Sequence, residues 1–457
     1  METGKQNMSE PLLHSCAPRR LYVQTFGCQM NEYDSLQVQR QLAALGYQPV
    51  EEMNRADLIF LNTCSVRGKA EQKVHSFLGR LRRLKEANPA LRIIVGGCVA
   101  QQLGQKLLDR FEYLDLVVGT RAVNSIGQLL QQVEESGRRG AFLHDDGNCG
   151  PVFQPQEILP QPGITAPVTI MQGCNNHCAY CIVPAVRGAE RSRRPGEILE
   201  EIRLLELSGV REVLLLGQNV NSYGRGLEEP IDFAGLLRRI VAETRVARIR
   251  FTTSHPKDLT EDLMNCFAEL GPLCKHLHLP VQAGSDTILA RMNRRYTAGE
   301  YREKVARLRR ICPQIALTSD IIVGFPGETE EDFGKTMELI EDIRFDNLFS
   351  FRYSDRPNTR ASGFADKVDG QAAARRLVEL QGRQAAITLE KNLAETGSLR
   401  EVLVEGPSKA SHGQITGRTS QNRIVNFEGP VSATGKILPV RIVAAYLHSL
   451  KGTVSSE

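Results

Sequence analysis

The alternation of short apolar runs with helical patterns constrains the fold of this chain more than any other feature. Between residues 21 and 150, strand-like runs occur at residues 21–26, 58–62, 93–95 and 114–118, and helical patterns separate them. Parallel strands need crossover connections, which are usually helices. The alternation therefore predicts an α/β fold with an open parallel sheet in this region.

Two further regions follow with different patterns. Between about residues 165 and 353, six strand-like runs alternate with helical patterns, which predicts an incomplete parallel (β/α)6 barrel. After a helical stretch from residue 371 to about 394, short strand-like runs separated by Gly and Pro turns predict a small all-β barrel. We expect three domains, at residues 18–148, 160–380 and 381–450.

The charge and the apolar content narrow the class of protein. The 457 residues carry 57 Lys and Arg against 53 Asp and Glu, and the net charge of +4 permits an RNA partner without requiring one. No apolar stretch approaches the about 20 residues of a membrane-spanning helix, and the first twenty residues lack the apolar block of a signal peptide. We therefore expect a cytoplasmic protein whose cysteines are reduced and serve as metal ligands or catalysts.

Cys174, Cys178 and Cys181 form the most specific motif, C-x3-C-x2-C, directly after an expected strand. This spacing places three thiolates on one loop around a single iron–sulfur cluster, and it leaves one of four irons free for another ligand. The alternative is a zinc site completed by a fourth ligand such as His177. Zinc sites usually use paired C-x2-C knuckles, which this region lacks.

Three other cysteines, Cys28, Cys64 and Cys98, are far apart in the sequence but share one context. Each follows an expected strand and precedes an expected helix. Open α/β sheets assemble sites at the carboxyl ends of their strands, and helix N-termini there favour anionic thiolates. The alternative is that each is a buried core residue. The remaining cysteines, which show no ligand spacing, are Cys16, Cys149, Cys266, Cys274 and Cys312.

The sequence around these cysteines resembles that of radical S-adenosylmethionine (SAM) methylthiotransferases. The motifs that carry the resemblance are 173–184 (GCNNHCAYCIVP), 187–193 (RGAERSR), 253–256 (TSHP), 276–282 (HLHLPVQ), 292–297 (MNRRYT) and 319–329 (SDIIVGFPGET). The resemblance extends from about residue 21 to 447 and is closest to the branch that acts on isopentenyladenosine in tRNA. The sequence departs from the family pattern at Ala185-Val186, where a Tyr-containing pair is more frequent, and at Asn358, where Gly is usual.

The resemblance implies cofactors and a reaction. It implies two 4Fe-4S clusters and two molecules of SAM per turnover. The cluster on the C-x3-C-x2-C cysteines would reduce SAM to a 5′-deoxyadenosyl radical, and a second cluster on Cys28, Cys64 and Cys98 would present the sulfur to be methylated and transferred. The acceptor would be carbon 2 of N6-isopentenyladenosine at position 37, in the anticodon stem-loop of tRNA. The resemblance also implies an electron donor such as flavodoxin or ferredoxin, a monomeric state and no association with a membrane.

Four residues are candidates for SAM binding. Tyr180 lies within the cysteine motif, and Arg191 belongs to an arginine-rich stretch, 187–194, that is either solvated or a binding edge for an anionic cofactor or RNA. Gly324 and Pro326 lie at a strand end that runs along the cofactor in the resembling family, and backbone amides near Gly324 would approach SAM without side-chain bulk.

The final segment resembles the TRAM domain, a small RNA-binding barrel, through residues 402–408 and 417–423. Small barrels bind RNA through basic strand faces and exposed loops, so Arg418 and Arg423 are the candidate RNA-binding residues. The alternative is a structural cap on the central barrel.

His276 and His278 alternate with leucines on an expected strand of the central region and should face the barrel interior, as structural or catalytic groups.

Two other functions share most of these features. A methylthiotransferase that acts on threonylcarbamoyl-adenosine in tRNA, or on a ribosomal protein, would carry the same cysteine motifs. A non-catalytic iron–sulfur sensor that binds RNA would also carry them, but it would not form 5′-deoxyadenosine from SAM.

Overall fold

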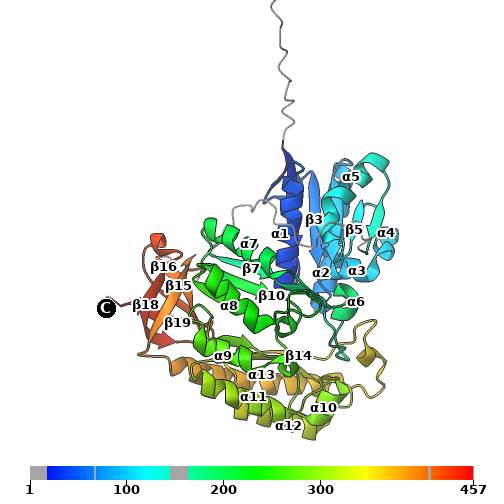
Figure 1. Cartoon of the computed structure of the whole chain (residues 1–457). Coiled ribbons are helices and arrows are strands. Elements are labelled where there is room, and N and C mark those ends of the chain that lie inside the picture. Colours follow the sequence, from blue (N-terminus) through cyan, green and yellow to red (C-terminus); the bar gives the residue numbers. More distant parts are fainter. Residues whose placement is uncertain (1–17, 66–67, 145–162, 410–412, 456–457) are drawn as a thin grey trace, which may run out of the picture.

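The computed structural model describes residues 18–65, 68–144, 163–409 and 413–455. An α/β domain, a central parallel barrel and a small terminal β-barrel follow one another along the chain, and both outer domains contact the central one (Figure 1). This arrangement agrees with the fold class that the sequence predicts. Cys16 and Cys149 lie outside the described residues.

The N-terminal domain contains a six-stranded parallel sheet in the order β2-β1-β3-β4-β5-β6. Its strands are β1 (Arg19–Thr25), β2 (Tyr47–Pro49), β3 (Leu58–Thr63), β4 (Arg92–Gly97), β5 (Leu116–Val118) and β6 (Gly140–Phe142). The sequence analysis misses β2 and β6, because these three-residue strands, Tyr-Gln-Pro and Gly-Ala-Phe, contain no apolar run or hydrophobic period.

Helices cover both faces of this sheet. They are α1 (Gln29–Ala43) and α5 (Ile126–Ser136) on one face, and α2 (Gly68–Ala87), α3 (Cys98–Leu103) and α4 (Gln105–Arg110) on the other. Alternate residues of β3 serve the two faces, since Leu58 and Phe60 belong to the core under α1 and α5, and Ile59 and Leu61 belong to the core under α2. Burial on both faces explains why the strands are continuously apolar.

The central domain is an incomplete barrel of parallel strands. Its strands are β7 (Thr165–Thr169), β10 (Glu212–Leu216), β11 (Arg248–Phe251), β12 (His276–His278), β13 (Ala316–Val323) and β14 (Asn347–Arg352). They form two three-stranded sheets, β11-β10-β7 and β12-β13-β14, which meet where Ile249 pairs with Leu273. The barrel stays open between β7 and β14, and an antiparallel pair, β8 (Met171–Gln172) and β9 (Arg191–Ser192), follows β7.

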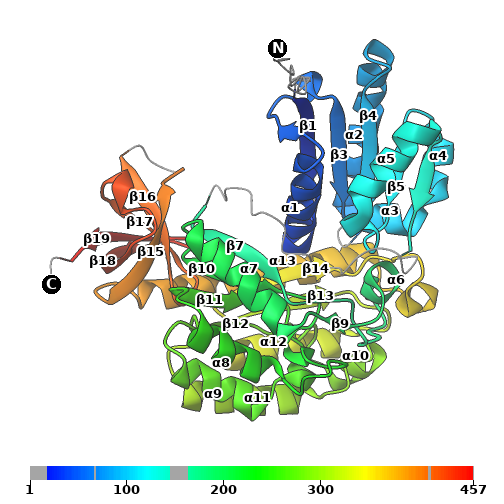
Figure 2. The ribbon, with the colours of Figure 1, turned by 45° about the horizontal axis from the view of Figure 1, so that its top comes forward.

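The barrel is surrounded by helices, which Figure 2 shows below the N-terminal sheet. They are α7 (Pro195–Leu207), α8 (Phe233–Glu243), α9 (Glu261–Glu269), α10 (Asp286–Arg291), α11 (Ala298–Ile311), α12 (Glu330–Ile343) and α13 (Gly370–Leu393). The short helix α6 (Val183–Arg187) follows the C-x3-C-x2-C loop. The expected domain limit at residues 380 and 381 falls inside α13, which packs along β14.

The terminal domain is a closed five-stranded barrel in the order β15-β16-β17-β19-β18. Its strands are β15 (Leu399–Pro407), β16 (Gln414–Thr419), β17 (Ile424–Glu428), β18 (Ile437–Ala445) and β19 (Leu450–Val454). Two arginines of β11 attach this barrel to the central one. Arg248 donates to the carbonyls of Arg418 and Glu401 at 2.6 and 2.9 Å, and Arg250 donates to those of Thr419 and Ser420.

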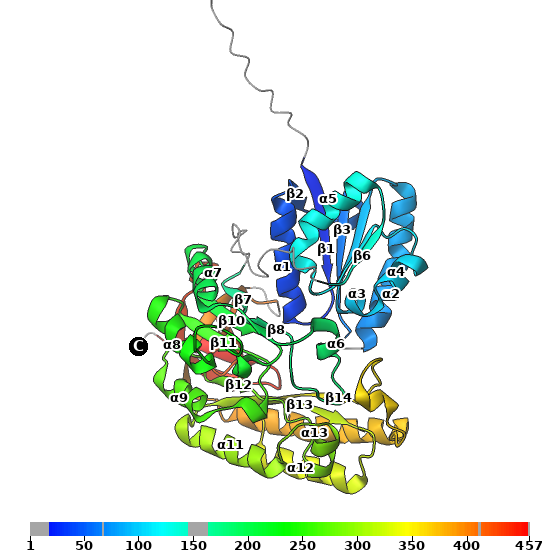
Figure 3. The same ribbon diagram turned by 45° about the vertical axis from the view of Figure 1, so that its right-hand side comes forward.

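The N-terminal domain meets the central barrel through α1, which lies beside β7 in Figures 1 and 3. Met30 and Tyr33 of α1 pack against Leu216 at the end of β10. The Tyr33 hydroxyl donates to the buried Glu201 carboxylate of α7 at 3.3 Å. The first turn of α1 is therefore held against the central barrel directly after Cys28.

We expect Gly97→Ala to destabilise the N-terminal domain more than Gly46→Ala. Both glycines have a positive φ, +93° and +82°, so both substitutions carry a backbone penalty of about 1–2 kcal/mol. Only at position 97 would the new Cβ also overlap the Thr63 carbonyl oxygen, whereas nothing lies within 4 Å at position 46. Urea unfolding of the metal-free chain, followed by far-UV circular dichroism, should give the lower midpoint for Gly97→Ala. Equal midpoints would contradict the packing argument.

Candidate functional site

The structure gathers Cys174, Cys178 and Cys181 on one loop between β8 and α6. The loop is shaped by its own backbone, since Cys178 N–H bonds Asn176 O at 2.8 Å and Cys181 N–H bonds Cys178 O at 3.0 Å. Burial, with a smaller contribution from the nearby Cys178, raises the pKa of Cys174 to about 11 and that of Cys181 to about 12. A bound cation would offset this cost of forming buried thiolates.

Two N–H donors point at the sulfurs of this loop. The backbone N–H of Asn176 lies 3.4 Å from Cys174 Sγ, and Arg294 Nη1 lies 3.4 Å from Cys178 Sγ. Arg294 is buried and held by the Pro280 carbonyl, which accepts from Nη2 at 2.6 Å. Donors to sulfur are typical of iron–sulfur sites, where they stabilise the negative charge of the cluster. The residues present therefore fit a 4Fe-4S cluster with three cysteine ligands.

Cys28, Cys64 and Cys98, distant in the sequence, converge at the carboxyl ends of β1, β3 and β4. The Cys64 side chain hydrogen-bonds the Cys28 thiol, and this interaction, assisted by the charge of Arg187, lowers the pKa of Cys28 to about 6, although the surrounding protein partly desolvates this surface-accessible thiol and opposes the shift. Burial raises the pKa of Cys98, although Arg187 opposes it. Within the described ranges, no group of three or more His, Cys, Asp or Glu side chains is arranged to hold a single metal ion.

Glycine and asparagine allow the three strand ends to approach so closely. Gly27 has φ +132°, and a Cβ at this position would lie 2.5 Å from Cys64 Cβ. The buried Asn31 amide donates to the Thr63 carbonyl at 2.8 Å and to Asn62 Oδ1 at 3.0 Å, and the Asn62 amide returns a bond to the Asn31 carbonyl. The sequence analysis missed both asparagines, since their only signal is a position near a strand end.

The helix α6 connects the two cysteine groups. It follows Cys181 directly, and its residue Val186 packs with Ile182 against Cys98. Arg187 ends α6 and forms a buried ion pair with Asp34 of α1, with Nη2 2.7 Å from Oδ2. The sequence placed Arg187 in a stretch that is either solvated or a binding edge, and its side chain is only 4% exposed. The structure thus links the second cysteine group, through Cys98, to the helix that follows the first group.

The candidate SAM-binding residues have different surroundings. The Tyr180 hydroxyl accepts from Arg294 Nη1 at 3.3 Å, beside the cysteine loop, and Arg191 is exposed on β9. Gly324 has φ +70° and its N–H bonds Glu328 Oε2 at 2.6 Å, so this amide is already engaged. The carbonyl of Pro326 accepts from Arg291 Nε at 3.0 Å. The assignment of these four residues to SAM remains a prediction.

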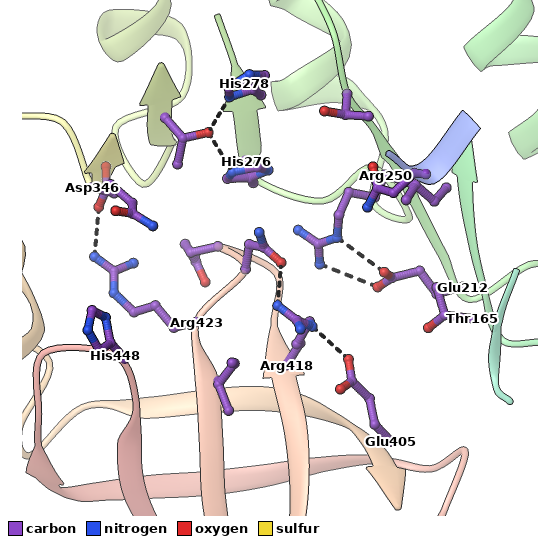
Figure 4. Close-up of a pocket in the computed structure, with 18 of the residues that line it drawn as sticks. Thr165, Glu212, Arg250, His276, His278, Asp346, Glu405, Arg418, Arg423 and His448 are labelled. Atoms are coloured by element: carbon purple, nitrogen blue, oxygen red, sulfur yellow. Dashed lines mark hydrogen bonds and ion pairs between the residues drawn. The ribbon is translucent and has the colours of Figure 1, made fainter. Parts of the chain in front are cut away.

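A cavity of about 910 Å³ is lined by residues of all three domains. Figure 4 shows that the terminal barrel supplies its lower wall and the strand ends of the central barrel its upper wall. Its lining includes Cys28 and Gln29 of the N-terminal domain, His278 and Phe349 of the central barrel, and Arg418 of the terminal barrel. Cys28 of the second cysteine group and the candidate RNA-binding domain therefore border the same cavity.

His276 and His278 line this cavity and share one hydroxyl. Thr318 Oγ1 lies 3.1 Å from His276 Nε2 and 3.0 Å from His278 Nδ1 (Figure 4). Burial lowers the pKa of His276 well below its ordinary value, so this imidazole is neutral. Both histidines face the barrel interior, in agreement with the strand alternation.

The candidate RNA-binding arginines are both engaged within the protein. Arg418 Nε donates to Glu405 Oε1 at 2.8 Å, and Arg423 Nη2 donates to Asp346 Oδ1 at 2.8 Å (Figure 4). Arg423 also reaches Asn392 of α13 at 3.2 Å, and its side chain is only 13% exposed. Arg423 thus joins the terminal barrel to the central one, and its role in RNA binding remains a prediction, as does that of Arg418.

We expect Cys28 to be the most reactive thiol of the metal-free protein. Cys28 is exposed and has a pKa of about 6, so its thiolate is protonated below that pH and its alkylation by iodoacetamide should rise with a midpoint near pH 6. Cys174, with a pKa of about 11, should stay unlabelled below pH 9. Peptide mass spectrometry measures both. Because the hydrogen bond from Cys64 is the largest cause, Cys64→Ala should move the midpoint to higher pH, and an unchanged midpoint would contradict this assignment.

Comparisons with known proteins agree with this architecture. The Radical SAM superfamily matches residues 168–340, the TRAM domain matches residues 393–455, and the Uncharacterized protein family UPF0004 matches residues 20–119. None of the helices in the described part combines the length and apolarity needed to cross a lipid bilayer.

Solved structures with similar folds are radical SAM enzymes. The methyltransferase TsrM from Kitasatospora setae, a radical SAM enzyme solved with cobalamin and a [4Fe-4S] cluster, aligns with a TM-score of 0.57 at 15% identity, covering 76% of this chain and 77% of that one. The cobalamin-dependent SAM radical enzyme OxsB aligns with a TM-score of 0.51 at 13% identity, covering 80% and 56%. At these identities the likeness concerns the fold alone.

Curated relatives match nearly the whole chain. A protein of Syntrophobacter fumaroxidans is 66% identical over 96% of this chain and 97% of its own length, and one of Geobacter metallireducens is 50% identical over 95% and 98%. A third, of Syntrophus aciditrophicus, is 49% identical over 99% and 98%. All three are named tRNA-2-methylthio-N(6)-dimethylallyladenosine synthase. With its C-x3-C-x2-C loop on a partial parallel barrel, the chain belongs to this family of radical SAM enzymes.

Proposed function

We propose that this protein adds a methylthio group to carbon 2 of N6-isopentenyladenosine at position 37 of tRNA. The name shared by relatives of 49% to 66% identity supports this substrate. The structural observation that supports the proposal is that α6, which directly follows Cys181, packs against Cys98 of the second cysteine group and pairs with Asp34 of α1. A reaction that both generates a radical and delivers sulfur needs two such centres next to each other.

Radical SAM enzymes use a 4Fe-4S cluster and SAM, and the Cys174, Cys178 and Cys181 loop is the candidate site for this cluster. These three cysteines would hold the cluster, and the chemistry it would supply is the one-electron reduction that cleaves SAM. The chain itself contributes Arg294, which holds Cys178 Sγ and Tyr180 in place from a buried position. Its positive charge favours the thiolate form of the loop.

We assign a second 4Fe-4S cluster to Cys28, Cys64 and Cys98. The low pKa of Cys28 keeps this ligand in the thiolate form at neutral pH. The Asn31 and Asn62 amides fix the strand ends that carry the cysteines. These three cysteines would hold the cluster, which would supply a binding place for the sulfur to be transferred, and the resemblance implies that the second SAM of each turnover would methylate this sulfur.

The cavity between the three domains is the proposed site of the target nucleoside. Phe349 is 48% exposed on β14, lines the cavity and meets the His278 ring edge-on, with centroids 6.0 Å apart. An exposed aromatic ring is a platform on which an unpaired RNA base stacks. A base on Phe349 would share one cavity with Cys28, where the sulfur is delivered, and with Arg418 of the TRAM domain.

The resemblance supplies the remaining parts of the proposal. The tRNA would be recognised through its anticodon stem-loop, and a flavodoxin or ferredoxin would supply electrons. The protein would act as a monomer in the cytoplasm.

We expect Cys174→Ala and Cys64→Ala to separate the two steps. Each variant, with reconstituted clusters, is incubated anaerobically with SAM, reductant and tRNA that carries isopentenyladenosine. Cys174→Ala should abolish both 5′-deoxyadenosine and the methylthio product, while Cys64→Ala should keep 5′-deoxyadenosine and lower methylthio product by at least about 100-fold. Mass spectrometry of the digested nucleosides measures the product.

Cys312→Ala is the matched control, because Cys312 is a buried cysteine outside both groups and should leave both products unchanged. Full product from Cys64→Ala would refute the second cluster. If the unaltered protein formed 5′-deoxyadenosine but did not modify isopentenyladenosine, the acceptor would be another substrate. If it formed neither, the protein would be a sensor.

Phe349→Ala should weaken binding of the anticodon stem-loop by roughly tenfold, because base stacking contributes about 1–3 kcal/mol. Formation of 5′-deoxyadenosine without tRNA should stay unchanged. Phe351→Ala is the matched control, since Phe351 is exposed on the same strand but does not line the cavity. Fluorescence anisotropy of a labelled stem-loop gives both affinities, and equal losses for the two variants would remove the stacking role of Phe349.

A further inference from the structure

Arg187 is buried with one of its donor groups unused. Its Nη2 donates to Asp34 Oδ2 at 2.7 Å and to Asn31 Oδ1 at 3.3 Å. Its Nη1 is buried and has no N, O or S acceptor at hydrogen-bonding geometry among the described residues, although the guanidinium lies close enough to the Cys98 thiol to influence its pKa. A buried donor without an acceptor costs about 1–3 kcal/mol, more when it is charged, so an unpartnered guanidinium N–H calls for a ligand.

The surroundings of Arg187 identify where this ligand would lie. Asn31 Oδ1, which accepts from Arg187, also accepts from the Cys28 thiol at 3.5 Å. Val186, the residue before Arg187, packs against Cys98. The guanidinium therefore belongs to the wall of the second cysteine group, between the ends of β1 and β4. If iron takes the place of the thiol proton, Cys28 can no longer donate a hydrogen bond to Asn31 Oδ1. Of the two donors, Arg187 then remains.

A second buried arginine at the same domain contact has a different role. Arg193 lies at the end of the β9 region, and its side chain is only 1% exposed. Its Nη1 donates to the Thr169 carbonyl at 2.9 Å and pairs with Glu201, the carboxylate that Tyr33 of α1 also contacts. Arg187 pairs directly with Asp34 of α1, whereas Arg193 supports the same domain contact through Glu201, and its contacts include Thr169, Glu201 and Glu197 of the central domain.

We propose that Arg187 is the positioning residue that sets the reduction potential of the second cluster, by directing its unpartnered Nη1 and its positive charge at the cluster sulfurs. The inference rests on the proposed function, because it requires a cluster on Cys28, Cys64 and Cys98. Hydrogen bonds to sulfur and nearby positive charge favour the reduced form of an iron–sulfur cluster. Asp34 acts in the opposite direction, since its carboxylate orients the guanidinium and offsets part of its charge.

The test uses the full chain with Cys174, Cys178 and Cys181 all changed to Ala, so that only the second cluster remains. The protein is reconstituted with iron and sulfide, its iron content is measured, and it is equilibrated with redox mediators at fixed potentials. Electron paramagnetic resonance then gives the ratio of reduced to oxidised cluster. Arg187→Met, Arg187→Lys, Asp34→Asn and Arg193→Met are each compared in this background.

We expect Arg187→Met to lower the ratio of reduced to oxidised cluster about tenfold at a fixed potential, which is about 59 mV for a one-electron couple. Arg187→Lys should recover part of this loss, because it keeps the charge but not the forked donor. Asp34→Asn should raise the ratio. Arg193→Met should leave it unchanged, although this variant removes a buried ion pair at the same domain contact.

Opposite shifts for Arg187→Met and Asp34→Asn separate an electrostatic role from a structural one, because both variants break the same ion pair and loss of docking alone would act in one direction. Shifts of the same sign, or no shift, would overturn the inference. If Arg187→Met fails to retain iron, the ratio of reduced to oxidised cluster in Asp34→Asn tests the inference instead, since Arg187 remains present in that variant. Absence of iron from the background protein itself would instead overturn the second cluster, and with it the inference.

Discussion

A buried ion pair between Arg187 and Asp34 joins the two halves of the candidate active centre. Arg187 ends the helix that follows the C-x3-C-x2-C loop, and Asp34 lies in the helix that follows Cys28. Both side chains are only 4% exposed. Loss of one partner from a buried pair costs about 3–5 kcal/mol, so the pair fixes the N-terminal domain against the central barrel wherever both charges are present. The distance between the two cysteine groups depends on this docking.

The second cysteine group depends on close approach of backbone segments within the N-terminal sheet. Parallel strands end at the same edge, but three loops meet only if little side-chain volume lies between them. Gly27 and Gly97 remove that volume at two of the three loops, and the Asn31 and Asn62 amides satisfy the carbonyl and amide groups that the approach buries. A Cβ at either glycine would overlap a neighbouring strand end and prevent this close approach.

The terminal barrel is attached by arginines in both directions. Arg248 and Arg250 of β11 donate to backbone carbonyls of the terminal barrel, and Arg423 of the terminal barrel pairs with Asp346 beside β14. Backbone carbonyls and a largely buried ion pair hold the two barrels in one orientation. Arg418 and Phe349 therefore face the same cavity, and the RNA-binding domain becomes one wall of the proposed nucleoside site.

The strand and helix alternation of the sequence predicts the three-part fold, since hydrophobic period and turn residues are local properties. Cys174, Cys178 and Cys181 are predicted as one group for the same reason, because they lie within eight consecutive positions on one loop. The short strands β2 and β6 were missed, and Cys28, Cys64 and Cys98 were brought together only as a hypothesis, because their contacts join distant segments. The resemblance to radical SAM methylthiotransferases, rather than spacing, gave this second group its role.

The sequence by itself determined the cysteine motif, the order of the domains and the family. Tertiary structure alone decided that Arg187 is a buried partner of Asp34 rather than a solvated charge, and that Arg423 holds two domains together. It also decided that one cavity joins Cys28, Phe349 and Arg418. The physical reason is that a side chain's burial and ionic partner depend on which surfaces dock, and Arg187 and Asp34 are 153 residues apart in the chain.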